Sequence, residues 1–261
     1  MQKEADRFIN STIFEGMTSI RGIIDGIRSG VNNRRINKIL FDKTKLPKIS
    51  KYIGYLKAVS FEMGYTIEES SAEKLESLTL GTSHGGIIAI CEDRILPALT
   101  LENSKENIKT HGFYAMIQGI EDPYNFGYCL RSLYACGCDG IILDKRNWMS
   151  AAGVVCRSSA GASELFSCFV GEDENVCDIF HSLGYNIVCA HEDTENMLGE
   201  AEIKLPVLLV VGGEKRGISK HVIQNSDMLV KIPYAREFKA SLSAASATTM
   251  FAYDIMRQNT K

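Results

Sequence analysis

Apolar and polar residues recur with two different periods along this chain of 261 residues. Apolar side chains at helical spacing predict amphipathic helices over residues 14–30, 48–64 and 242–258, and a shorter helix over 71–79. Short apolar runs bounded by turn residues predict strands at 36–42, 65–70, 85–92, 112–120, 139–143, 165–170, 185–190, 206–211 and 228–232. Strands alternating with helices predict an α/β protein.

The pattern divides the chain into two halves. Residues 1–100 predict a small three-layer α/β domain, and residues 112–261 predict a parallel sheet covered by helices on both faces. The segment 101–111 is polar without apolar periodicity, so we expect a linker there. Parallel sheets bind ligands at the carboxyl ends of their strands. The glycine-bearing turns at 122–127 and 212–217 are predicted to lie at such ends.

Composition and charge narrow the class of protein. An apolar fraction of 45% with 23% charged residues is typical of a soluble globular protein. The apolar runs are too short for membrane spans and the first residues lack the apolar core of a signal peptide, so we expect a cytoplasmic protein without a membrane partner. The net charge is −3, yet residues 1–50 carry 10 Lys and Arg against 5 Asp and Glu. This local excess is densest over 28–38 and suits phosphate contacts.

The eight cysteines form no CxxC pair, and the five histidines make no ligand-spaced cluster with them. We therefore expect buried, reduced thiols and no metal site.

The stretch DPYNFGYCLR (122–131) joins a predicted strand to a predicted helix. Its Asp, Pro, Asn and Gly are the residues that a tight turn needs. Arg131, one turn into the helix, is not required by the turn. A surface arginine on an ordinary connection explains the stretch equally well.

Two further stretches follow predicted strands. VVGGEKRGIS (210–219) has glycines that let a ligand approach the backbone, and Ser219 can cap the next helix. Neither G-x-G-x-x-G nor a phosphate loop is present, which disfavours dinucleotides and nucleoside triphosphates. At 230–258 a strand ends at Ile232, and Ser241 and Leu242 open a helix of small residues. Its N-terminus offers N–H donors to a ligand, although tight helix packing explains the small residues as well.

The order and spacing of D-P-x-N-x-G-x-x-x-R, G-x-E-x-x-G-x-S and I-P-x…S-L resemble the SpoU (TrmH) family of ribose 2′-O-methyltransferases, of the SPOUT class. RSSAGASEL (157–165) resembles the family's segment between the first two motifs. Residues 14–30 and 82–90 resemble a small RNA-binding domain, akin to a kink-turn-binding ribosomal protein, that precedes many members. The resemblance covers nearly the whole chain.

The resemblance implies a substrate-binding domain at 1–100 and a SPOUT domain at 112–261 that contains a trefoil knot. It implies a homodimer whose active site forms where two knots meet. S-adenosylmethionine (SAM) would lie in the knot, bound at Val211, Gly212, Gly213, Ile232, Ser241 and Leu242. The substrate would be structured RNA, with ribosomal RNA favoured over transfer RNA.

The resemblance also implies roles in catalysis and RNA docking. Arg131 would orient the phosphate beside the target ribose or assist activation of its hydroxyl, since a guanidinium can hold a phosphate bidentately. Asn125 would shape the pocket and Glu214 would lie near the substrate. The expected RNA-docking residues are Arg21, Arg28, Arg34, Arg35, Lys38 and Arg216.

The chain departs from the family's usual residues at a few positions. Ser243 stands where an active-site Asn is usual and is taken as its catalytic counterpart, and Tyr234 stands where Met is usual. These departures keep open an alternative, a diverged protein that binds RNA and SAM with little or no methyl transfer. A small-molecule transferase or an oxidoreductase is disfavoured by the missing dinucleotide motif.

Overall fold

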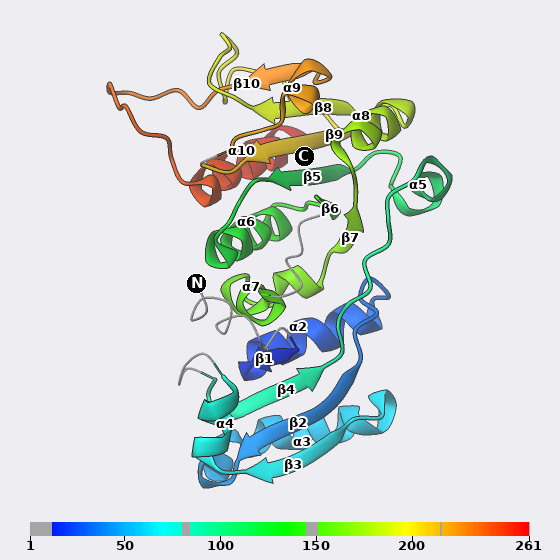
Figure 1. Ribbon diagram of the computed structural model, residues 1–261, viewed down its shortest axis with the longest axis vertical. Coiled ribbons are helices and arrows are strands. Elements are labelled where there is room, and N and C mark those ends of the chain that lie inside the picture. The colour runs from blue at the N-terminus through cyan, green and yellow to red at the C-terminus, as the bar shows by residue number, and fades with distance from the viewer. Residues whose placement is uncertain (1–11, 80–83, 145–150, 215, 261) are drawn as a thin grey trace. The chain divides into compact units, whose positions relative to one another are not determined.

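The computed structural model describes residues 12–79, 84–144, 151–214 and 216–260, which fold into two compact units (Figure 1). Unit 1 comprises Met1–Ile95 and Asn147–Leu165, and unit 2 comprises Leu96–Arg146 and Phe166–Lys261. The chain therefore enters unit 2, returns to unit 1 and then completes unit 2. The predicted division into residues 1–100 and 112–261 did not include this return. Among the described residues, every helix is too short or too polar to cross a membrane.

Unit 1 contains a four-stranded sheet in the order β1-β4-β2-β3, in which only β2 and β3 are parallel. Its strands are β1 (Ile13–Glu15), β2 (Ile36–Asp42), β3 (Thr66–Ser70) and β4 (Ile87–Cys91). Its helices are α2 (Gly16–Arg28), α3 (Leu46–Met63), α4 (Ala72–Leu78) and α7 (Ala152–Ser158), with 3-10 turns η2 (Lys43–Lys45) and η4 (Ala162–Glu164).

Successive side chains of β2 point to opposite faces of the sheet, and helices cover both faces, as the predicted three-layer domain requires. Ile39 and Phe41 pack in one core with the apolar faces of α2 and α3. Leu40, between them, points to the other face and packs with Leu75 of α4. The three-layer prediction for this domain is therefore confirmed.

The returning segment is built into unit 1. Cys156 of α7 belongs to the same core as α2 and α3. Gly22 of α2 touches the backbone of Gly161: a Cβ at Gly22 would lie 2.7 Å from the Gly161 carbonyl oxygen. This close approach needs glycine at position 22. Gly161 belongs to the segment 157–165, which resembles the family's segment between the first two motifs.

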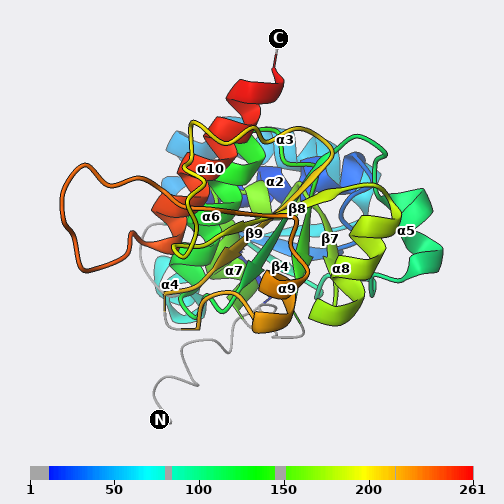
Figure 2. The same ribbon diagram turned by 90° about the horizontal axis from the view of Figure 1, so that it is seen from above.

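Unit 2 contains six strands, all paired in parallel, in the order β10-β8-β9-β5-β6-β7. They are β5 (Phe113–Gln118), β6 (Gly140–Leu143), β7 (Ser167–Val170), β8 (Asn186–Ala190), β9 (Val207–Gly212) and β10 (Met228–Val230). Helices α6 (Pro123–Ala135) and α10 (Ala244–Asn259) lie on one side, and α8 (Asp173–Ser182) and α9 (Lys220–Gln224) on the other (Figure 2). The predicted parallel sheet with two covered faces is confirmed.

The predicted linker is wrong in one respect, because it contains helix α5 (Leu101–Asn107). Thr100 accepts a hydrogen bond from the backbone N–H of Asn103, and the Asn103 side chain accepts one from the backbone of Thr100. This capping box stabilises a helix that has no apolar periodicity.

Candidate functional site

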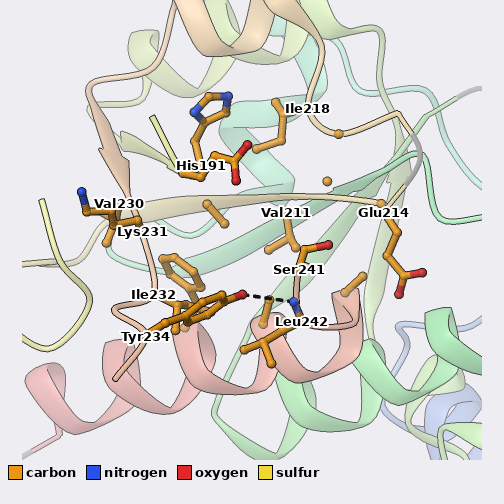
Figure 3. Close-up of a pocket in the computed structure, with 18 of the residues that line it drawn as sticks. His191, Val211, Glu214, Ile218, Val230, Lys231, Ile232, Tyr234, Ser241 and Leu242 are labelled. Atoms are coloured by element: carbon orange, nitrogen blue, oxygen red, sulfur yellow. Dashed lines mark hydrogen bonds between the residues drawn. The ribbon is translucent and has the colours of Figure 1, made fainter. Parts of the chain in front are cut away.

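A cavity of about 890 Å³ opens at the carboxyl ends of β9 and β10 in unit 2 (Figure 3). The six residues expected to bind SAM all line it: Val211, Gly212, Gly213, Ile232, Ser241 and Leu242. The structure thus brings together segments that lie about thirty residues apart in sequence. Their contact with a cofactor stays a prediction.

Two glycines let the end of β9 cross the neighbouring backbone. A Cβ on Gly212 would overlap the backbone of Gly217, and one on Gly213 would overlap the carbonyl of Gly119. The Gly213 N–H donates to the carbonyl oxygen of Gln118 at 2.7 Å. The second motif is therefore held against the turn that leads from β5 into the first.

The DPYNFG stretch is a capped helix start. Asp122 accepts hydrogen bonds from the backbone N–H groups of Tyr124 and Asn125, each at 3.2 Å, and Pro123 occupies the first helical position. Asn125 is half-buried. Arg131 is exposed on α6 and makes no hydrogen bond or ion pair within the described part of the chain. The cap accounts for Asp122 and Pro123, and Arg131 takes no part in it.

Glu214 and Arg216 lie on the rim of the cavity, and both are exposed. The Arg216 guanidinium lies 3.7 Å from the Glu121 carboxylate, at the entrance to the first motif. This exposed pair is weak and exchangeable, so Arg216 stays available to a phosphate.

Ser243 is the N-cap of α10. Its hydroxyl oxygen accepts from the Ser246 backbone N–H at 3.2 Å and lies 3.0 Å from the Ser246 hydroxyl. The cavity lining includes Ser241, Leu242 and Ala244 but not Ser243. The structure therefore gives Ser243 a helix-capping contact, and its catalytic role stays a prediction. Ser219 caps α9 in the same way, as expected.

Sequence reasoning noted Tyr234 only as a departure from the family's usual residue, and it missed His191 altogether. The Tyr234 hydroxyl accepts a hydrogen bond from the Leu242 N–H at 3.1 Å and so closes the loop between β10 and α10 (Figure 3). His191 follows β8, and its Nδ1 accepts from the Asp193 N–H at 3.1 Å. Tyr234 belongs to the third motif, whereas His191 belongs to none of the three, and no signal in the sequence marks the two as lining one cavity.

One expected RNA-docking residue is wrong. Arg34 is only 3% exposed, and its guanidinium contacts the Glu164 carboxylate at 3.0 Å and the Glu92 carbonyl at 2.8 Å. It also stacks over the Phe14 ring. A buried, fully paired arginine cannot reach a phosphate.

The other basic residues of unit 1 remain at the surface. Arg28 pairs with Glu62, Arg35 with Glu92 and Lys38 with Glu68, all in exposed pairs. The Arg21 guanidinium lies over the rings of Tyr52 and Tyr55. Exposed pairs contribute little and yield to a polyanion, so these residues stay candidates for RNA contact.

Most of the cysteine thiols are free and buried, and burial disfavours their reactive thiolate form. Six of the eight cysteines are buried and all eight are free. Burial raises the pKa of Cys129 to about 11 and that of Cys91 to about 12. Within the described residues no group of three or more His, Cys, Asp or Glu side chains is placed to hold a metal ion.

The sequence model of the SpoU rRNA Methylase family matches residues 112–253, more than half of the chain. The chain belongs to this family. It is an RNA methyltransferase that uses SAM. The match begins at residue 112, where the methyltransferase domain was expected to start, and it contains the cavity and all three motifs.

Individual relatives agree with this assignment. A 23S rRNA (guanosine-2′-O-)-methyltransferase RlmB of Shewanella oneidensis is 29% identical over 201 residues, 75% of this chain and 79% of the relative. A crystal structure of an RNA 2′-O ribose methyltransferase superposes with a TM-score of 0.76 at 20% identity, over 98% of this chain and 95% of that one. The SpoU methyltransferase AviRb of Streptomyces viridochromogenes, in complex with AdoMet, gives 0.73 at 21% identity over 94% and 89%. The two structures show that the fold is shared over both units.

Proposed function

We propose that this chain methylates ribosomal RNA on a ribose 2′-hydroxyl, in the cytoplasm, as a homodimer. One observation carries the proposal: residues of the second and third family motifs line one cavity at the carboxyl ends of parallel strands, and Gly213 of the second motif packs against Gly119, in the turn that leads into the first. The relative from Shewanella is named for the same reaction on 23S rRNA, which favours ribosomal RNA as the substrate.

The cavity fits a cofactor bound mainly through backbone. Its volume lies within the range of small-molecule sites. The main-chain N–H and C=O of Ile232 make no hydrogen bond to any described residue, so both are available to a ligand. Gly212 and Gly213 present bare backbone. Since Nδ1 of His191 accepts a hydrogen bond, its Nε2 carries the proton and is a donor at the cavity wall.

When bound, SAM supplies a methyl group activated by its sulfonium sulfur. Transfer would join the ribose oxygen to the methyl carbon while the carbon–sulfur bond breaks, so the residues of the chain would have to position the hydroxyl and accept its proton. Glu214 is an exposed carboxylate at the cavity that can accept it. The Arg131 side chain offers only hydrogen-bond donors, so we assign it to the neighbouring phosphate, which it would hold in place.

An exposed aromatic face supports the homodimer. Tyr124, Tyr128 and Arg131 lie at i, i+4 and i+7 on α6, so they share one side of the helix. Helix α10 packs beside α6 through a 2.6 Å hydrogen bond between Ser132 and Thr249, and it exposes Met250 and Tyr253. Such a face needs a partner. A second copy would cover it and place Arg131 at the junction.

The remaining expectations extend the same proposal. The strand order places β9 between β5 and β8, and the resemblance implies a trefoil knot where these strands meet the cavity. Unit 1 would dock the RNA through its exposed cations, with Arg34 removed from that set. The alternative is a protein that binds RNA and SAM without transferring the methyl group. Ser243 does not support this alternative, because its hydroxyl caps helix α10.

Transfer of label from methyl-labelled SAM to deproteinised ribosomal RNA, from a host that lacks this protein, tests the proposal. We expect label that survives alkaline hydrolysis as a protected dinucleotide. Arg131→Ala should lower kcat/KM at least 100-fold while the Kd for SAM changes less than twofold, and Arg131→Lys should recover little because a lysine cannot hold a phosphate bidentately. SAM binding without any incorporation, on naked RNA and on ribosomal subunits, would establish the binding-protein alternative instead.

A further inference from the structure

The loop between β10 and α10 extends away from the sheet of unit 2 (Figures 1 and 2). Residues 233–240 of this loop are exposed throughout. Tyr234 is 44% exposed and Phe238 is 58% exposed. A phenylalanine side chain has no polar atom that gains from water, so its exposure on a loop beside a binding cavity calls for a partner.

The two rings form one unit at the edge of the cavity. Their centroids lie 6.1 Å apart, with the ring planes inclined by 61°. Tyr234 is anchored through its hydroxyl to the Leu242 N–H. Both rings line the same cavity as Ser241, Leu242 and Glu214, and Figure 3 shows Tyr234 beside Leu242. The aromatic surface therefore continues the wall of the proposed SAM site towards solvent, where the substrate must enter.

The charges of the loop suit a polyanion. Arg236 and Lys239 are exposed and make no ion pair with any described residue, and Glu237 is the single acidic residue between Ile232 and Leu242. Lys239 lines the cavity, whereas Arg236 does not. Aromatic rings alternating with cations are the arrangement by which proteins hold single-stranded nucleic acid, through base stacking and phosphate contacts.

We propose that Phe238, supported by Tyr234, stacks on a nucleobase of the RNA substrate next to the ribose that is methylated, with Arg236 and Lys239 contacting the adjoining phosphates. This inference rests on the proposed function, because it assumes an RNA substrate at this cavity. A ring can stack on any base, since every base has a π-face. The loop therefore positions the substrate and leaves the choice of sequence to other contacts.

The test compares side chains of different π character at position 238. Phe238→Leu keeps an apolar side chain of similar size without a π-face, and Phe238→Trp enlarges the π-face. Kinetics with deproteinised ribosomal RNA and the Kd for SAM are measured for both variants, with Arg236→Gln as the charge control. We expect Phe238→Leu to raise KM for RNA roughly tenfold, with the Kd for SAM within twofold, and Phe238→Trp to match the wild type. Arg236→Gln should weaken the dependence of KM on salt concentration.

Three results would overturn the proposal. Equal KM values for Phe238→Leu and the wild type would show that no base stacks there. A parallel loss of SAM binding would show that the ring packs the cofactor cavity instead. A change from dimer to monomer in Phe238→Leu, seen by light scattering, would assign the loop to a second copy of the chain. A wild type that methylates no RNA fails the proposed function itself, a result visible before any variant is compared.

Discussion

Ser243 illustrates how one residue can satisfy a structural need at a position expected to be catalytic. We expect Ser243→Ala to lower the free energy of unfolding by about 1 kcal/mol, because the Ser246 N–H loses its acceptor. Ser243→Asn should change it by only a few tenths, since Asn caps equally well. Denaturant unfolding of the three proteins measures both. Equal stability of the alanine variant would show that the cap contributes nothing.

The buried Arg34–Glu164 pair predicts a larger effect. Arg34→Met leaves the Glu164 carboxylate, 3% exposed, without its cation. We expect a loss of about 3–5 kcal/mol in the free energy of unfolding. Arg35→Met is the matched control, because its pair with Glu92 is exposed and longer, at 3.8 Å, and should change stability by less than about 0.5 kcal/mol. Similar midpoints of chemical denaturation for both variants would contradict this assignment.

Adjacent residues 34 and 35 also mark the limit of sequence reasoning at this scale. Both belong to the same basic stretch, and only the structure separates a buried arginine from an exposed one. The distinguishing partner, Glu164, lies 130 residues away, so no local pattern reveals it. Six residues of the cavity were predictable because they belong to the second and third motifs, whereas His191 lies outside all three motifs and was not.

At the scale of elements, strong periodicity predicted well and local capping did not. Strand β2 has the predicted bounds, and α3 ends one residue before the predicted Gly64. Helix α5 was missed because a capping box, not an apolar face, stabilises it. Strand β1 has only three residues and depends on pairing with β4, about 75 residues later. Elements fixed by such distant or single contacts carry no periodic signal.

Two helical glycines predict opposite effects of the same substitution. Gly22→Ala places a methyl group 2.7 Å from the backbone of Gly161, where neither main chain can yield easily, so we expect a loss of about 1–3 kcal/mol. Gly54→Ala, in α3, meets open space and should gain about 0.5–1 kcal/mol from helix propensity. Thermal or chemical unfolding of the two variants and the wild type measures both changes in stability. A gain in both variants would mean that α2 and the returning segment pack less closely than described.

The whole molecule is predicted to be a dimer built on α6 and α10. Tyr128→Glu puts a charge on the exposed aromatic face of α6 and should yield a monomer. We expect little activity from this monomer, because Arg131 on the same face would no longer lie against a second copy of the chain. Phe61→Glu is the control, since Phe61 is a ring on α3 of unit 1 that is exposed even more, at 91% against 47% for Tyr128. Light scattering after gel filtration measures both masses. A dimeric Tyr128→Glu protein would exclude this face as the interface.

The return of residues 147–165 to unit 1 has a consequence for synthesis on the ribosome. A nascent chain emerges N-terminus first, at roughly 5–20 residues per second. The residues up to Ile95 are therefore made on the order of 10 s before Glu164 and Cys156 follow. During that interval Arg34 has no counter-ion and the face of α2 that receives α7 is bare. The first unit is thus completed only after part of the second has been made, although most of it is encoded first.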